Sequence, residues 1–178
     1  MKDLSMHIMD ILQNSTRAGA TEITLEVLED KTTDTLTLRF IDNGCGMDAE
    51  MLSHVLNPFF TTRTTRRVGL GLSLIKQNAE QTGGSLLINS EKGVGTTVTA
   101  IFGLSHIDRP EMGDLAGTVV LTASAYPDIR FIFHYQTDTI DYTFDTQEVV
   151  EVLDGISIQE PEVIQYLKEM IEENIKTQ

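Results

Sequence analysis

Two short stretches of the chain hold residues that could do chemistry, and the first is residues 42–47. It reads Asp-Asn-Gly-Cys-Gly-Met and follows an alternating run that is typical of a strand. Paired glycines let a ligand lie close to the backbone, while the fixed carboxylate of Asp42 accepts hydrogen bonds from it. An exocyclic amine, such as that of adenine, would suit this acceptor. The stretch therefore indicates a nucleotide-binding turn.

The second stretch is the pair Asp10 and Asn14, which lie four residues apart near the start of the chain. Residues at this spacing are neighbours on one face of a helix. A carboxylate beside a carboxamide offers oxygen atoms that suit Mg²⁺ and a water molecule. Taken without the glycine turn, the same pair would be read as two polar positions on an exposed helix face.

The elements that must position these residues follow from periodicity and turn chemistry. A helix is expected over residues 3–18, with Gly19 at its C′ position, and the glycine turn closes the second of two strands. A polar hairpin over 29–34 joins those strands, and residues 61–68 form a basic loop without periodicity. The predicted helices are 3–18, 48–55, 69–82, 114–125, 147–153 and 161–176, and the predicted strands are 22–28, 35–41, 85–89, 96–102, 130–136 and 140–145.

Composition limits the class of protein. The chain has 178 residues, of which 40% are hydrophobic, enough for one domain with a core or one domain with a small appendix. Its apolar runs are much shorter than the roughly 18 residues of a membrane span, and its first residues lack the apolar stretch of a signal peptide. A single cysteine excludes an intramolecular disulfide. We therefore expect a cytoplasmic protein.

Charge separates the last part of the chain from the rest. Residues 105–178 hold 4 Lys and Arg against 15 Asp and Glu, and so carry −11 of the total charge of −14. Nucleic acids and acidic membranes would be repelled by this part of the chain, so neither is an expected partner. Two interpretations stay open: a solvated acidic surface, or a docking face for a basic partner.

Five motifs in order resemble the Bergerat-fold (GHKL) ATPase superfamily, and the histidine-kinase-like branch most of all. The likeness covers roughly residues 4–102. It implies an α/β two-layer sandwich, with a mixed sheet covered by helices on one face, over residues 1–104. The residue pattern itself predicts a small acidic α-β-β-α extension over 105–178. The motifs are Asp10-x-x-x-Asn14, Asp42-x-Gly44-x-Gly46-Met47, Pro58-Phe59-Phe60-Thr61-Thr62, Gly69-Leu70-Gly71-Leu72-Ser73 and Gly93-x-Gly95-Thr96-Thr97.

The resemblance assigns roles around the base and the metal. Asp42 would accept the adenine N6 hydrogen bond and Asn14 would hold Mg²⁺ between the phosphates of ATP. Three residues of the turn and two threonines would surround the base, one of the threonines reaching it directly or through water. These are Gly44, Gly46, Met47, Thr96 and Thr97.

It also assigns the phosphate contacts. Backbone N–H groups around Gly69, Leu70, Gly71 and Leu72 would meet the phosphates at a helix N-terminus, where the dipole favours anions. Arg63, with Arg66 or Arg67, would reach the γ-phosphate from the loop, because a guanidinium binds phosphate oxygens in a fork. Thr62 of the same loop is also expected to contact the nucleotide.

Catalysis is the open point of the resemblance. The superfamily has Glu where this chain has Asp10, the residue that would orient or deprotonate the attacking group. The phosphate loop has Arg67 where a further glycine is usual. Two hypotheses follow: an enzyme that hydrolyses ATP or phosphorylates a partner, or a non-catalytic ATP-sensing module in which ATP orders residues 61–68. A structural protein that has lost nucleotide binding is a third reading, opposed by the intact Asn14 and Asp42.

The resemblance also bears on partners. No dimerisation or phosphoacceptor helices precede the first motif, so a complete sensor histidine kinase is not expected. The whole pattern is similar to small stand-alone ATP-binding proteins of anaerobic bacteria whose genes travel with iron hydrogenase and redox genes. A protein partner of redox or hydrogenase type is therefore the expectation, and the oligomeric state stays open.

Overall fold

The computed structural model describes residues 3–57 and 68–176, and of residues 68–70 the backbone alone. Helices and strands alternate along these two stretches. The elements are α1 (Leu4–Arg17), β1 (Glu22–Asp30), β2 (Thr35–Asp42), α2 (Ala49–His54), α3 (Val68–Gln81), β3 (Ser85–Glu91), β4 (Gly95–Gly103), α4 (Leu115–Ala125), β5 (Arg130–Gln136), β6 (Asp141–Asp145), α5 (Thr146–Leu153) and α6 (Pro161–Ile175).

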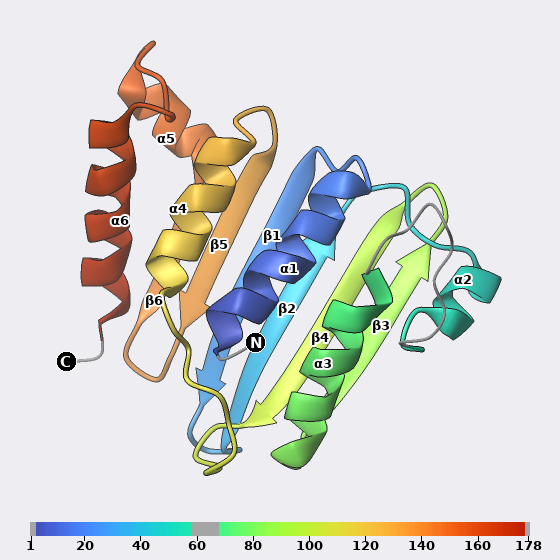
Figure 1. Cartoon of the computed structure of the whole chain (residues 1–178). Coiled ribbons are helices and arrows are strands. Elements are labelled where there is room, and N and C mark those ends of the chain that lie inside the picture. The colour runs from blue at the N-terminus through green and yellow to red at the C-terminus, as the bar shows by residue number, and fades with distance from the viewer. Residues whose placement is uncertain (1–2, 58–67, 177–178) are drawn as a thin grey trace.

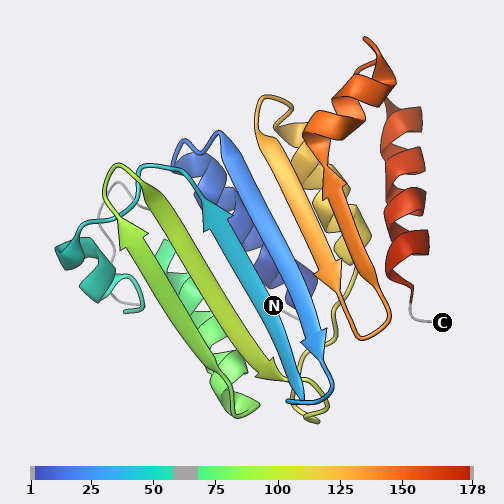
Figure 2. The same cartoon turned by 180° about the vertical axis from the view of Figure 1, so that it is seen from behind.

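The six strands form one mixed sheet in the order β3-β4-β2-β1-β5-β6. β1 and β5 are parallel, and the other neighbours are antiparallel. Helices α1, α3 and α4 lie on one face of the sheet (Figure 1). Figure 2 shows the opposite face of β1–β4, over which no described helix lies. The predicted α/β class, with a mixed sheet covered on one face, is confirmed.

The last two strands belong to this same sheet. β5 pairs with β1 from Glu22 and Arg130 at one end to Leu28 and Gln136 at the other. The predicted α-β-β-α order after residue 104 is present as α4, β5, β6 and then α5 and α6. Hydrogen bonding therefore continues across the sequence position at which composition changes. The division into a 1–104 domain and an extension stays a prediction.

The core forms between the covered face of the sheet and its helices. Every second residue of β2, namely Leu36, Leu38 and Phe40, is fully or almost fully buried, as period-two alternation predicts. The apolar stripe of α1 packs on the same face. Burial of each large apolar side chain contributes roughly 1.5–3 kcal/mol, so these layers hold α1 firmly against β2. The buried stripe of α1 includes Leu4, Ile8, Ile11 and Leu12.

Helix ends follow the expected chemistry. The Asp3 carboxylate accepts a hydrogen bond from the Met6 N–H and begins α1, and Gly19 follows that helix with φ +76°. The Asp114 carboxylate accepts from the Gly117 N–H in the same way and begins α4. The predicted position of Gly19 is confirmed.

The first hairpin is shorter than predicted. Glu29 and Asp30 continue β1 and pair with Leu36 and Thr35, which leaves residues 31–34 as the turn. Asp34 adopts a positive φ of 52° there. The polar side chains of Glu29 and Asp30 led to a predicted end of the strand that is too early. Backbone pairing in a β-ladder does not require an apolar side chain.

α4 is the most completely buried helix of the layer. It lies between α1 and α6 and packs on β5, so almost all of its residues face protein, and Leu121 is its one large exposed side chain. A helix that is apolar all round is expected in such a position. Within residues 3–57 and 68–176 no helix has both the length and the apolar character that crossing a membrane requires.

A buried polar contact joins α1 to α3. The Nε2 atom of His7 lies 2.8 Å from the Asn78 amide nitrogen, and His7 is almost fully buried. His7 Nδ1 has no hydrogen-bond partner among the described residues. Burial lowers the pKa of the His7 imidazole below its usual value, and the Asp3 carboxylate opposes this shift. The folded protein therefore holds His7 neutral between the two helices.

Acidification should weaken the fold through His7. The unfolded chain binds a proton on His7 near its ordinary pKa of 6.5, whereas the folded chain does so only at lower pH. Stability is therefore fully present above pH 6.5 and falls below it, by at most about 1.4 kcal/mol per pH unit, until the pH has passed through the folded-state pKa. Urea unfolding between pH 7.5 and 5.5 measures the slope. The His7→Gln variant should lose this part of it, and the exposed-site variant His106→Gln should keep it. An unchanged slope in His7→Gln would contradict the assignment.

Candidate functional site

Asp42 ends β2 with both carboxylate oxygens held in place. Oδ1 accepts a hydrogen bond from the Gly44 N–H at 2.9 Å, and Oδ2 accepts one from the Ser15 hydroxyl at 2.7 Å. The Asp42 carboxylate is therefore fixed by one contact within the turn and by a second contact from α1. Each carboxylate oxygen has two lone pairs, so Asp42 keeps acceptor capacity for a ligand. The side chain is half-buried, so a ligand can reach it.

Ser15 lies on the buried, mostly apolar stripe of α1. The structure buries it on that stripe but turns its hydroxyl to Asp42. A lone hydroxyl among apolar positions, directly after Asn14, is the signal that could have marked it. A buried hydroxyl is usually hydrogen-bonded, so the partner would have to come from the neighbouring strand.

The glycine turn is packed between two other parts of the chain. Gly44 is buried against Ala18 at the end of α1, and the Cys45 N–H donates to the Ala18 carbonyl at 2.9 Å. Gly46 has φ +66°, and a Cβ on it would collide with the Glu91 carbonyl. Only glycine fits this conformation and this approach at residue 46. The turn is therefore fixed by backbone packing before any ligand binds.

Asn43 is a further residue of the turn that the motif alone did not single out. Its Oδ1 accepts hydrogen bonds from the Thr21 and Glu22 N–H groups at 2.9 and 3.0 Å, and its Nδ2 donates to the Thr21 hydroxyl. These contacts tie the turn to the start of β1. Asn43 thus shapes the site from its outer side.

The strand register separates the two threonines that were expected near the base. Thr96 pairs with Asp42 across β2 and β4, while Thr97 pairs with Ile41. Successive strand residues point to opposite faces, so Thr96 shares the covered face with Asp42 and Thr97 lies on the other face. The register therefore brings Thr96 to the site and does not bring Thr97.

Ser90 supports both Thr96 and Met47. Its hydroxyl lies 2.8 Å from the Thr96 hydroxyl and accepts the Met47 N–H at 2.8 Å, while donating to the Gly95 carbonyl at 3.1 Å. Met47 is half-buried and packs against the core. The residues expected around the base are thus linked by hydrogen bonds between β3, β4 and the turn.

Asp10 lies against the first turn of α3. A Cβ placed on Gly71 would collide with the Asp10 carboxylate, so the absence of a side chain at residue 71 makes room for that group. Burial raises the pKa of the Asp10 carboxyl above its usual value, and the charge of Arg17 opposes the shift. A more basic carboxylate is a better proton acceptor.

Asn14 stands one helical turn further along α1, on the face of Asp10 and next to Ser15. Its half-buried side chain makes no hydrogen bond to other described side chains or backbone groups. Within the described ranges no group of three His, Cys, Asp or Glu side chains could hold a metal ion. A single amide oxygen fits a Mg²⁺ ion that takes its other ligands from phosphates and water.

The residues predicted to contact phosphate are only partly within the described chain. Thr62 and Arg63 lie outside it, as does the predicted loop as far as residue 67. Gly69 and Leu70 belong to the first turn of α3, followed by Gly71 and Leu72, which are buried. The first N–H groups of a helix lack partners within it, so this end of α3 offers donors and a favourable dipole to an anion.

These parts meet at one end of the molecule. The end of β2, the last turns of α1 and the start of α3 are adjacent in Figure 1. The Ser15–Asp42 hydrogen bond joins α1 to the end of β2, and the Asp10–Gly71 contact joins α1 to the start of α3. The arrangement can therefore take an amine-bearing base at Asp42 and an anionic group at α3, with Asn14 between them.

Sequence comparison finds relatives among sensor proteins. A "Putative sensor protein" of Shewanella frigidimarina is 33% identical over 109 residues, which cover 60% of this chain and 17% of that protein. The "Sensor histidine kinase YvrG" of Bacillus subtilis is 29% identical over 97 residues, with 52% and 17% covered. The chain therefore spans about a sixth of the length of these relatives.

Solved structures share the fold. The "Aquifex aeolicus MutL ATPase domain complexed with ADP" superposes with a TM-score of 0.55 at 17% identity, covering 88% of this chain and 70% of that one. The family model described as "Histidine kinase-, DNA gyrase B-, and HSP90-like ATPase" matches residues 2–106, more than half of the chain. The chain therefore belongs to the family of histidine kinase-, DNA gyrase B- and HSP90-like ATPases.

Proposed function

We propose that this protein binds Mg-ATP at the site between α1, α3 and the glycine turn, and that it hydrolyses the nucleotide or transfers its γ-phosphoryl group to a protein partner. The carrying observation is the Asp42 carboxylate, held by Ser15 and Gly44 at the same end of the sheet as the Asp10–Gly71 contact. Membership of the ATPase family supports ATP as the ligand.

Each residue then has a distinct task. Asp42 accepts a hydrogen bond from the adenine amine, with Thr96 beside it on the same face of the sheet. The first turn of α3 receives the phosphates, because its free N–H groups and dipole favour anions. Asn14 would hold Mg²⁺, which neutralises phosphate charge when bound.

Asp10 is proposed as the general base. Its carboxylate stands at the start of α3, where the phosphates are proposed to lie, and its pKa is raised by burial. It would accept the proton of the attacking water or hydroxyl. Phosphoryl transfer depends mainly on positioning and charge neutralisation, which this group of residues can supply.

A non-catalytic ATP-sensing module is the second candidate, and the size of Asp10 favours it. The carboxylate already packs on Gly71, and it is one methylene shorter than a glutamate at the same position. In that case ATP would bind and change the affinity for a partner without being consumed. A protein partner is proposed for both candidates, in the cytoplasm where ATP is available. Association with redox or hydrogenase proteins stays a prediction.

Replacing Asn14 should separate metal-dependent from metal-independent binding. Asn14→Ala removes the proposed metal ligand, so the affinity for Mg-ATP should fall by about tenfold or more, while the weaker affinity for ATP in EDTA stays within about twofold. Isothermal titration with and without Mg²⁺ measures both. Gln77→Ala, which removes an exposed amide from α3, is the matched control. Absence of ATP binding by the unmodified protein would exclude both candidate functions.

A further inference from the structure

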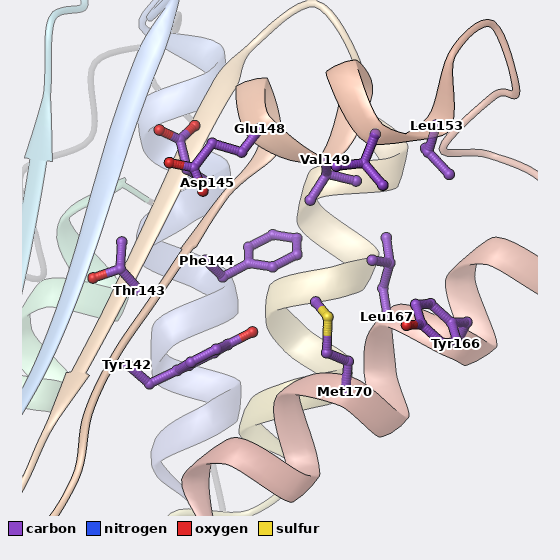
Figure 3. Close-up of a pocket in the computed structure, with 11 residues that line it drawn as sticks. Tyr142, Thr143, Phe144, Asp145, Glu148, Val149, Leu153, Tyr166, Leu167 and Met170 are labelled. Atoms are coloured by element: carbon purple, nitrogen blue, oxygen red, sulfur yellow. The ribbon is translucent and has the colours of Figure 1, made fainter.

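The part of the chain beyond the ATPase family match carries an apolar groove of its own. A cavity of about 300 Å³ lies between β6, α5 and α6, at the opposite edge of the sheet from β3 and α2. Figure 3 shows Phe144 and Tyr142 of β6, Val149 of α5 and Met170 of α6 around it. We call it the β6–α5–α6 groove, lined chiefly by Tyr142, Phe144, Val149, Val152, Tyr166 and Met170.

Two of these side chains are largely exposed to solvent. Val152 is 84% exposed and Tyr166 is 65% exposed, and they approach the groove from α5 and α6. Val150 and Ile156 are exposed nearby in sequence. Apolar residues that gather on a surface and are rimmed by charge mark interaction sites more often than isolated ones do. The groove therefore has the apolar character of an interaction site.

The charge around the groove selects the occupant. α5 has no Lys or Arg, and the one basic residue within α6, Lys168, is paired with Asp114 and Glu172. Five exposed carboxylates stand on the two helices, and those at positions 162 and 169 share the Tyr166 side of α6 by helical spacing. The five are Glu148, Glu151, Glu162, Glu169 and Glu173.

We propose that the β6–α5–α6 groove docks a segment of a protein partner that carries apolar side chains flanked by Lys or Arg. Apolar side chains would fill the cavity, and the basic flanks would lie over the carboxylates. An acidic membrane or a nucleic acid would be repelled by the same rim, and a second copy of this chain would bring two acidic surfaces together. This docking does not require nucleotide, so it is independent of the proposed ATP site.

A model peptide tests the groove directly. The probe is an amphipathic Leu/Lys helix of about 14 residues, or four turns, with one central Trp. The chain itself has no Trp, so the fluorescence of the peptide reports binding alone. Saturable one-to-one binding is expected. The double variant Val152→Ser with Tyr166→Ser should weaken it by about tenfold or more, as loss of central apolar anchors does. Both side chains are exposed, so the variant should fold.

Three controls make the result decisive. Ile107→Ser changes another exposed apolar residue far from the groove in sequence, and should leave binding unchanged. Glu148→Lys with Glu169→Lys should weaken binding of the Lys peptide, and a matched Leu/Glu peptide should not bind the unmodified protein. Amide chemical shifts should change along β6, α5 and α6. Absence of saturable binding, equal binding by the double Ser variant, or equal binding of the Glu peptide would overturn the proposal.

Discussion

Asp42→Asn is expected to lower the affinity for ATP by roughly a hundredfold, about 3 kcal/mol, without unfolding the protein. The variant amide oxygen can still accept the Gly44 N–H, and the Ser15 hydroxyl can rotate to accept from the amide nitrogen. The adenine amine then meets a donor in place of an acceptor. Loss of a charge-assisted hydrogen bond, with a donor left unpaired, accounts for a change of this size.

The same substitution should alter base preference. An asparagine amide can donate to the O6 atom of inosine triphosphate, so the Asp42→Asn variant should bind inosine triphosphate at least as well as ATP. The unmodified protein should prefer ATP. Isothermal titration of both nucleotides measures the reversal. Asp48→Asn makes the same chemical change at the exposed N-cap of α2 and should alter neither affinity. Equal ATP affinity in Asp42→Asn and the unmodified protein would place the base elsewhere.

Asp10→Asn is expected to reduce phosphate release by about a hundredfold or more while ATP affinity changes by less than about threefold. A general base contributes roughly 10²–10⁴ to the rate, and an amide cannot replace it. Asp10→Glu restores a carboxylate and should keep turnover. The exposed pair Lys76–Glu80 provides the control variant Glu80→Gln. Turnover that persists in Asp10→Asn would remove Asp10 from the role of base. No turnover by the unmodified protein, alone or with a partner, would favour the sensing module.

The Asp10→Asn substitution should raise the stability of the folded protein while it lowers turnover. The raised pKa means that the protonated carboxyl favours the folded state, and that this contribution is lost as the pH rises through the folded-state pKa. Asparagine stays neutral, so Asp10→Asn should be slightly more stable than the unmodified protein at pH 7. Below the ordinary pKa of 3.8 this pH-dependent difference disappears. Thermal unfolding at pH 7 and pH 3.5 compares them, and shows whether lost turnover comes from unfolding.

Much of the fold was accessible from the sequence because local rules agree with the global arrangement here. Alternation in β2 and helical spacing in α1 both give the buried face correctly. The N-cap of α1 at Asp3 and the end of that helix at Gly19 each depend only on residues close by in sequence. The end of β1 was misplaced, because Glu29 and Asp30 pair through backbone groups that sequence polarity does not report.

The motifs of the candidate site can be read from the sequence, whereas the hydrogen bonds that connect them cannot. Asp42, Asn14 and the paired glycines are recognised by type and spacing. The Ser15 and Ser90 hydroxyls could not be assigned, since their partners come from elements distant in sequence. The choice of Thr96 over Thr97 depends on the β2–β4 register, which fixes the face on which each residue lies. The groove beyond residue 140 has no motif at all, because it depends on the packing of α5 and α6.

Because β5 pairs with β1 in parallel, residues 105–178 cover the edge that β1 would otherwise expose. A chain cut after residue 104 would lose β5 and leave the whole length of β1 as a free edge. Unpaired N–H and C=O groups along such an edge invite pairing with other molecules and hence aggregation. The same cut would remove α4 from beside α1, which carries Asp10 and Asn14. Residues 105–178 therefore cover an edge strand of the sheet and support the helix that carries the candidate site residues.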